Sequence, residues 1–214
     1  MLRCCFLNDL TGLRNPTNAQ NMFYHFDDVV RDVSDRLARA ASDRKVPMHS
    51  PVVVTGDVDA RVMVLREFDA QRWTLRFHTD TRAPKVNAID ADPRMAVLFY
   101  DQPAKVQIRV RGTGKVLRVG PQVDAAWAES TNFARRCYLG EGPGVVSDAP
   151  TSGLPAEFEG VEPDEQQVIP ARENFGIVTV TLESLDWFHL AHTGHIRAQF
   201  EREGESWEGR WVAP

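Results

Sequence analysis

The stretch AKVQIRVRGTGKVLRV, residues 104–119, alternates apolar and polar side chains, as a strand with one buried face does. From Val106 to Val110 every second side chain is valine or isoleucine. The opposite face carries Gln107, Arg109 and Arg111. The segment GTGKV at 112–116 superficially resembles a phosphate-binding loop, but the strand-to-helix flanks and the spacing of such a loop are missing. The stretch therefore predicts one long strand with a bend.

Apolar runs on both sides of this strand predict a mainly β protein. Residues 51–68, PVVVTGDVDARVMVLREF, carry β-branched runs on either side of GDVD, a pattern typical of a hairpin. Further predicted strands are RWTLRFHT (72–79), RMAVLFY (94–100), FGIVTVTL (175–182), a hairpin over 185–200, and GRWVA (209–213). Six or more antiparallel strands with few helices indicate a closed or nearly closed barrel.

Four helices and one long loop are expected around these strands. From Phe26 to about Arg44 the apolar side chains have the spacing of an amphipathic helix. Pro84 is expected to open a short helix, because proline suits the first helical position. Two more short helices are expected at 121–129 and 131–138. Residues 148–170 are acidic, proline-bearing and aperiodic, which predicts a mobile loop.

Size and composition limit the class of protein. A chain of 214 residues with 43% hydrophobic content can bury one sizeable core, so residues 22–214 are expected to form a single domain. Residues 1–21 lack a period and are a candidate disordered segment. No apolar run approaches the roughly 20 residues of a spanning helix, and the N-terminus is too weak for a secretory signal. Three cysteines and a net charge of −5 fit a cytoplasmic protein without general affinity for nucleic acid.

The segment WFHLAHTGHIRAQF, residues 187–200, holds three histidines at a spacing of three. In a hairpin, side chains alternate between faces, so His189 and His195 cannot share a face with His192 in one regular strand. Gly194 disfavours a helix that would gather all three. No Cys, Asp or Glu stands at a zinc-like spacing nearby, which argues against a metal site. An ordinary hairpin and a site that combines an aromatic ring, an imidazole and a fixed positive charge both stay open.

Five motifs occur in an order typical of one family. They are RVMVLR (61–66), FHTDTRAPKV (77–86), QIRVRG (107–112), the Trp187/His195/Arg197 spacing and the terminal WVAP. In this order they resemble pyridoxamine 5′-phosphate oxidase and its relatives, the FMN-binding split barrels, over roughly residues 26–214. The resemblance implies a mainly β (α+β) fold, an antiparallel six-stranded split β-barrel of Greek-key type with flanking helices.

The resemblance also implies FMN as the cofactor, bound at two sites between the subunits of a homodimer. Arg82 matches the family's phosphate-binding arginine, and arginine's forked donors suit a phosphate. The next position, often lysine in the oxidases, is Ala83, and Lys85 is expected to compensate. Arg197 would lie near the electron-accepting edge of the flavin, where positive charge stabilises a reduced anionic ring. The implied cofactor contacts are Arg61, Val62, Met63, Val64, His78, Thr79, Arg82, Lys85, Gln107, Trp187 and Arg197.

The substrate side of the family pattern is less complete. Arg66 stands where the oxidases have a lysine that touches the substrate phosphate, and Arg136, or its neighbour Arg135, is the candidate for a second contact. His195 is expected to be a substrate-side group. Two residues before it the oxidases have an arginine, and here that position is Thr193. No catalytic residue and no metal ligand is assigned.

Three functions stay open on these grounds. The first is an FMN-dependent oxidoreductase that acts on an undefined small substrate. The second is a genuine pyridoxamine or pyridoxine 5′-phosphate oxidase, and the third is a non-catalytic split-barrel protein that binds flavin or haem. The cofactor residues favour the first two functions over the third. Thr193 favours the first over the second.

Overall fold

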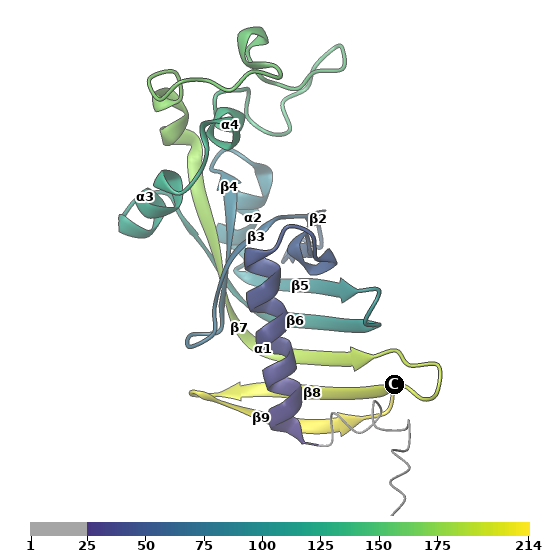
Figure 1. Cartoon of the computed structure of the whole chain (residues 1–214). Coiled ribbons are helices and arrows are strands. Elements are labelled where there is room, and N and C mark those ends of the chain that lie inside the picture. Colours follow the sequence, from purple (N-terminus) through teal and green to yellow (C-terminus); the bar gives the residue numbers. More distant parts are fainter. Residues whose placement is uncertain (1–24) are drawn as a thin grey trace, which may run out of the picture.

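The computed structural model describes residues 25–214, in which nine strands form one antiparallel sheet with a long helix packed against it (Figure 1). The strands are β1 (Val52–Thr55), β2 (Ala60–Val62), β3 (Leu65–Asp69), β4 (Thr74–Asp80), β5 (Arg94–Asp101), β6 (Val106–Leu117), β7 (Phe175–His189), β8 (Ile196–Glu203) and β9 (Ser206–Val212). Their order is β2-β1-β5-β6-β7-β4-β3, and β8 and β9 extend the sheet from β7. The predicted mainly β, antiparallel class is confirmed, with nine strands in place of six. The prediction that residues 1–21 are disordered concerns residues outside the described range.

Strand β7 is shared between two parts of the sheet. It pairs with β6 along nearly its whole length, with β4 through its first half and with β8 through its second half. The sequence predicted two separate strands here, ending and restarting near Glu183. The structure has one strand. Its register with β6 shifts between Arg111, which pairs with Ser184, and Gly112, which pairs with Leu182. Glu183 is therefore one additional residue on β7, and this β-bulge leaves the strand continuous.

Gly112 allows β6 and β7 to come together at this irregularity. A Cβ atom at Gly112 would lie 1.9 Å from the carbonyl oxygen of Thr181, which no other residue could tolerate. The predicted bend in GTGKV is therefore a local shift of register inside a continuous strand, β6, and the segment does not have the strand-to-helix form of a phosphate-binding loop.

Helix α1 (Phe26–Ser42) covers one face of the sheet, as Figure 1 shows. Its buried side chains are Val29, Val33, Leu37 and Ala40, which repeat with the helical period and confirm the predicted amphipathic helix. They join a core formed by the inward side chains of the strands, among them Phe77, Phe99 and Trp187. Asp27 and Asp28 lie in the first turn, where negative charge favours the helix dipole.

Shorter helices lie at the end of the sheet formed by β4 and the start of β7. Pro84 opens α2 (Pro84–Ala91) as predicted. The two helices expected within 121–138 are α3 (Pro121–Ala128) and α4 (Asn132–Arg135), followed by a 3-10 turn. Val123, Ala126, Phe175 and Ile177 form a second, smaller core here. This core supports the segments on which several candidate site residues stand.

The segment after these helices, residues 139–168, contains one 3-10 turn (Ala156–Phe158) and otherwise irregular backbone. Two arginines hold it. Nη1 of Arg135 contacts Glu165 at 3.0 Å, and Nη1 of Arg136 donates to the carbonyl oxygens of Phe158 and Val161 at 2.9 Å each. The mobility predicted for 148–170 stays a prediction.

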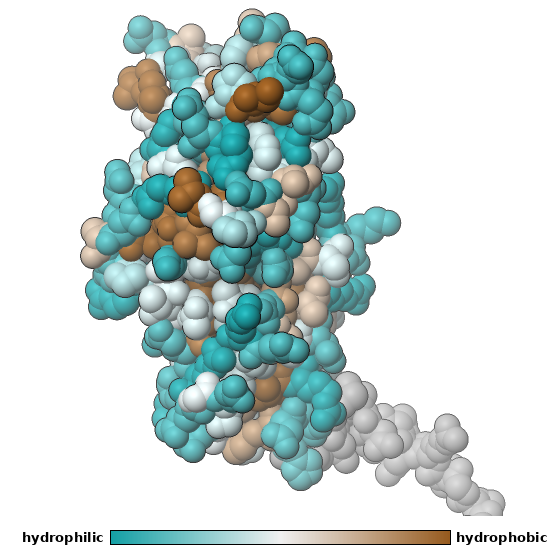
Figure 2. Space-filling view, turned by 90° about the vertical axis from the view of Figure 1, so that its left-hand side faces the viewer, coloured by the Kyte–Doolittle hydropathy of each residue, from teal (hydrophilic) through white to brown (hydrophobic). Residues whose placement is uncertain are grey.

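Two surface properties matter for possible partners. Figure 2 shows apolar surface gathered at mid-height on one side of the molecule, bordered by hydrophilic residues. Patches of this kind are typical of interaction sites. Within residues 25–214, no helix has both the length and the apolar character needed to cross a membrane.

Candidate functional site

The turn between β1 and β2 fixes the side chain of Arg61. Its Nη1 donates to Oγ1 of Thr55 at 2.9 Å, and its Nη2 bonds to the carboxylate of Asp59. Thr55 in turn donates to Asp57 at 2.5 Å. Only a fifth of the Arg61 side chain is exposed, so the guanidinium is oriented before any ligand arrives.

The segment from β4 to α2 positions two more cations. Arg82 donates to Oδ1 of Asp80 through its Nε at 3.0 Å and to Oδ2 through its Nη2 at 2.7 Å. These hydrogen bonds raise the pKa of Arg82 above its ordinary value. A further Nη1 bond at 3.0 Å reaches the carbonyl oxygen of Gly140, so Arg82 also ties down the start of the long loop. Lys85 follows in the first turn of α2.

Arg61, Arg82 and Lys85 are brought into one charged cluster with Asp59 and Asp80. Burial lowers the pKa of Lys85 below its ordinary value, the charge of Arg61 lowers it further, and Asp80 and Asp59 act in the opposite direction. The structure thus places Lys85 within electrostatic reach of Arg61, although they are far apart in sequence. Asp57 also acts on Arg61 and Glu173 on Arg82, so three cations and four carboxylates meet in this region.

The apolar residues after Arg61 have different surroundings. Val62 is largely exposed, Met63 is buried in the core, and Val64 is partly buried. Their predicted contact is with the flavin, and the structure does not place all three on one surface. That role stays a prediction.

His78 lies partly buried on β4, with its ring edge against Phe175 at a centroid distance of 4.9 Å. Burial, together with the charges of Arg66 and Arg76, lowers the pKa of His78 from 6.5 to about 3. The imidazole is therefore neutral at ordinary pH, and its buried Nε2 has no hydrogen-bond partner among residues 25–214. The next residue, Thr79, is buried and donates to the carbonyl oxygen of Asp80 at 3.1 Å.

A cavity of about 280 Å³ lies beside His78. It is lined by Ala41, Ser42, Arg44, His49, Leu65, Arg66, Arg76, His78, Glu129, Ser130, Thr131 and Ala134. Burial lowers the pKa of Arg66, and its buried Nε has no hydrogen-bond partner in the part of the chain that the structure describes. Arg76 contacts Glu67 at 2.8 Å and Glu129 at 3.1 Å. Because its arginines outnumber its single carboxylate, the cavity suits a small anion.

Arg136 does not line this cavity. Besides its bonds to the loop carbonyls, its guanidinium lies over the ring of Phe133 at 3.6 Å from the centroid. Arg135 is buried and donates to the carbonyl oxygens of Trp127 and Ala128 at 3.0 and 3.2 Å. The structure therefore does not bring Arg136 together with Arg66, and its substrate-side role stays a prediction.

The remaining candidates lie on β6, β7 and the hairpin to β8. Gln107 is partly buried on β6, and His195 is exposed in the β7–β8 loop, with its ring 5.5 Å from that of Phe188. Arg197 donates to Asp186 through Nε at 3.0 Å and Nη2 at 2.7 Å. Within residues 25–214, no group of three or more His, Cys, Asp or Glu side chains is placed to hold a metal ion.

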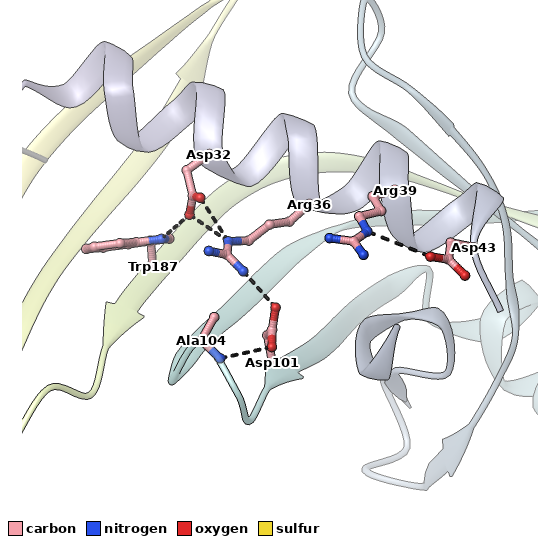
Figure 3. Close-up of polar contacts among 7 residues, drawn as sticks. All are labelled: Asp32, Arg36, Arg39, Asp43, Asp101, Ala104 and Trp187. Carbon is pink, nitrogen blue, oxygen red and sulfur yellow. Dashed lines mark hydrogen bonds and ion pairs between the residues drawn. The ribbon is translucent and has the colours of Figure 1, made fainter. Parts of the chain in front are cut away.

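Trp187 and Arg197 project to opposite faces of the sheet. Trp187 pairs with Ala198, whereas Arg197 pairs with Phe188, so the alternation of the strands separates the two side chains. Trp187 is fully buried toward α1, where its Nε1 donates to Oδ2 of Asp32 at 2.9 Å (Figure 3). A contact between the indole and a flavin stays a prediction, and the indole's place in this chain is the core.

The carboxylates that orient these cations were not identified from the sequence. Asp59, Asp80 and Asp186 each stand within two residues of a predicted site residue. This closeness in sequence is the signal from which they could have been identified. Taken together, the cations Arg61 and Lys85, and the nitrogen atoms of Arg66 and His78 that lack a hydrogen-bond partner among residues 25–214, fit a phosphate-bearing group and a second small anion. The residues present are therefore compatible with FMN.

Comparisons with known proteins agree with this fit. Residues 40–118 match the family model described as the FMN-binding domain of pyridoxamine 5′-phosphate oxidase. A pyridoxine/pyridoxamine 5′-phosphate oxidase from Myxococcus xanthus is 26% identical over 195 residues, which cover 87% of this chain and 92% of that protein. One from Caulobacter vibrioides is 36% identical over 64 residues, 30% of this chain and 28% of that protein.

Solved structures share the fold. A pyridoxamine 5′-phosphate oxidase-related, FMN-binding protein from Nostoc punctiforme has a TM-score of 0.69 at 21% identity, covering 86% of this chain and 97% of its own. PhzG from Burkholderia lata 383, in complex with tetrahydrophenazine-1-carboxylic acid, has a TM-score of 0.62 at 14% identity, covering 87% and 92%. The predicted split-barrel fold is confirmed, and so is the resemblance to the pyridoxamine 5′-phosphate oxidase-related FMN-binding split barrels.

Proposed function

We propose that this protein is an FMN-dependent oxidoreductase that holds the flavin between two copies of the chain and acts on a small anionic substrate. The observation that carries the proposal is the cluster of Arg61, Arg82 and Lys85 in a chain whose matched domain is FMN-binding. Lys85 is partly buried beside Arg61, and the two cations disfavour each other. A phosphate dianion between them would relieve that repulsion.

The sheet order supports a site built from two chains. Arg61 stands on β2 and Arg197 on β8, and β1, β5, β6 and β7 lie between these strands. At about 4.8 Å per strand, five spacings amount to roughly 24 Å along the sheet. One flavin is therefore more readily contacted by Arg61 of one copy and Arg197 of the other than by the two residues of a single chain. The apolar patch in Figure 2 gives a second copy a surface to cover.

Bound FMN would supply the electron-accepting chemistry, and the protein would supply binding and orientation. In this proposal Arg61 and Lys85 bind the phosphate, while Arg82 neutralises Asp80 beside it and anchors the loop at Gly140. Arg197 places positive charge on the face of the sheet opposite α1. Arg66 holds the anionic group of the substrate, since its Nε is buried and has no hydrogen-bond partner within the described residues.

A second candidate is a genuine pyridoxamine 5′-phosphate oxidase. The likeness to the Myxococcus xanthus oxidase along 92% of that protein favours it, as does the cationic cavity at Arg66. Thr193 argues against it, because an oxidase of this family has an arginine there. Losing one charge-assisted hydrogen bond to a phosphate costs about 1.5–3 kcal/mol.

Titration of the purified apo protein with FMN, followed by calorimetry and absorption spectroscopy, tests the proposal. We expect about one FMN per chain, a flavin spectrum and a dimer by light scattering. Arg61→Ala should weaken binding, whereas Arg94→Ala should not, because Arg94 is an exposed arginine already paired with Asp92 at 2.6 Å. Absence of FMN binding by the unmodified chain would refute the proposal, and a haem spectrum would favour the non-catalytic alternative.

A further inference from the structure

Asp186 is the centre of a polar network on the face of the sheet opposite α1. Besides its two bonds from Arg197, it accepts one from Nε2 of Gln199 at 3.1 Å and one from Nη2 of Arg109. Its side chain is only 14% exposed, although its neighbours on this face are polar. Partial burial would raise the pKa of Asp186, but the hydrogen bonds from Arg197, Gln199 and Arg109 outweigh burial and hold the pKa below its ordinary value.

The strand register creates this network. Arg109 on β6, Asp186 on β7 and Gln199 on β8 are direct cross-strand partners, so their side chains start about 5 Å apart on one face. Arg210 on β9 continues the row and donates to Oε1 of Gln199 at 3.3 Å. Arg197 stands two residues from Gln199 on β8, which places its guanidinium diagonally across from Asp186.

The network holds two guanidinium groups close together. Arg109 and Arg197 share one carboxylate, and without it they would repel each other across β7. The three side chains together keep one net positive charge. Both arginines stay accessible, with 44% of the Arg109 side chain and 23% of the Arg197 side chain exposed, so an anionic or electron-rich group could approach them.

We propose that Asp186 is a positioning residue of the flavin site: it orients Arg197 and brings Arg109 beside it, so that two guanidinium groups face the flavin ring. This inference rests on the proposed function. Arg109 and Asp186 would then set the charge beside the ring, which controls how readily the flavin accepts electrons. If the network served only to pair the strands, changing its charge would alter stability and leave the bound flavin unaffected.

The midpoint potential of bound FMN separates these alternatives. Asp186→Asn removes a negative charge beside the two arginines and should shift the potential to a more positive value, because the reduced anionic flavin gains stabilisation. Arg109→Gln leaves the Arg197–Asp186 pair intact, removes one cation and should shift the potential in the negative direction. Asp90→Asn is the matched control, since Asp90 forms an exposed ion pair with Arg118 and should leave the potential unchanged.

The results distinguish this inference from the proposed function. Opposite shifts in the two variants would support the inference. An unchanged potential in either variant, with FMN bound, would overturn it and leave the proposed function standing. Should Asp186→Asn fail to fold, Arg109→Gln alone decides. If the unmodified chain binds no FMN, the proposed function fails and the inference fails with it.

Discussion

The indole Nε1 of Trp187 donates to the carboxylate of Asp32 at 2.9 Å, which joins β7 to the first half of α1 (Figure 3). The same carboxylate accepts from Nε of Arg36 at 2.9 and 2.8 Å, and Nη1 of Arg36 reaches Asp101 at the end of β5 at 2.8 Å. One helix is thus tied by polar contacts to two strands of the sheet that it covers. These contacts are partly buried, so they contribute more than exposed pairs would.

We expect Trp187→Phe to destabilise the fold and to leave FMN affinity nearly unchanged. The substitution keeps an aromatic ring in the core but removes the donor to Asp32, which costs about 1–2 kcal/mol. Urea unfolding of the apo protein measures the change. A loss of FMN affinity well beyond the loss of stability would instead indicate that the indole contacts the flavin, as the family resemblance implies.

For the phosphate cluster, we expect Arg61→Ala and Lys85→Ala each to weaken FMN binding by about 1.5–3 kcal/mol, one to two decades in Kd. Arg82→Ala should weaken it at least as much, because it leaves the buried carboxylate of Asp80 unpaired beside the phosphate. Adding Asp80→Asn to Arg82→Ala should restore part of the affinity. Calorimetry on the four variants tests this; no recovery in the double variant would place Arg82 itself on the phosphate.

The partly buried His78 predicts an acid-sensitive fold. Its pKa is about 3 in the folded chain and 6.5 when unperturbed, so between these values the unfolded chain binds a proton that the folded chain does not. The free energy of unfolding should therefore fall as pH decreases below about 6.5, by at most roughly 1.4 kcal/mol per pH unit from this group. Urea unfolding across this range should show a shallower dependence in His78→Gln. Equal slopes would mean that His78 is more solvated than its position indicates.

The two-chain site predicts complementation between damaged subunits. Arg61→Ala and Arg197→Ala homodimers should each bind FMN weakly. A mixed dimer should regain one intact site, because the two substitutions then fall on the same doubly damaged site and spare the other. Mixing the unfolded variants and refolding them together, followed by FMN titration, measures this. The architecture is wrong if no affinity returns, or if a monomer binds FMN fully.

We expect pyridoxamine 5′-phosphate to be a poor substrate, because Thr193 replaces a cation that would hold it. Anaerobic mixing of the FMN-loaded protein with this compound, followed by flavin absorbance, measures the rate of bleaching. Bleaching should be slow, and Thr193→Arg should speed it by about one to two decades. Rapid, saturable bleaching by the unmodified protein would favour the genuine oxidase.

Periodic segments could be predicted from the sequence, whereas the joins between strands could not. The alternation of 104–119 predicted β6, and the apolar spacing after Phe26 predicted α1 to within two residues of its end at Ser42. The six strands that the resemblance implied are nine in the structure, and 51–68 contains three strands in place of a two-stranded hairpin, with β2 and β3 separated at Met63 and Val64. The β-bulge at Glu183 cannot be recognised from the hydrophobic pattern, so two strands were predicted where the structure has β7 alone.

The cations of the candidate site could be predicted, but their partners depend on register and tertiary packing. Arg61, Arg82 and Lys85 were predicted from the family resemblance. That Asp186 meets Arg109 follows only once β6 and β7 are aligned, since a shift of one residue would turn Arg109 to the other face. The same alignment separates Trp187 from Arg197. The contacts of Arg136 could not be predicted either, because its partners are backbone carbonyl oxygens of an irregular segment.

The position of β7 has a consequence for folding kinetics. It pairs with β4, which precedes it by about a hundred residues, so this contact forms only after α2, β5, β6 and the long loop are brought into place. Pairings of such high contact order slow folding, whereas the β5–β6 and β8–β9 hairpins are local and can form early. Refolding should therefore begin at these two hairpins and reach its rate-limiting step when β7 docks between β4 and β6.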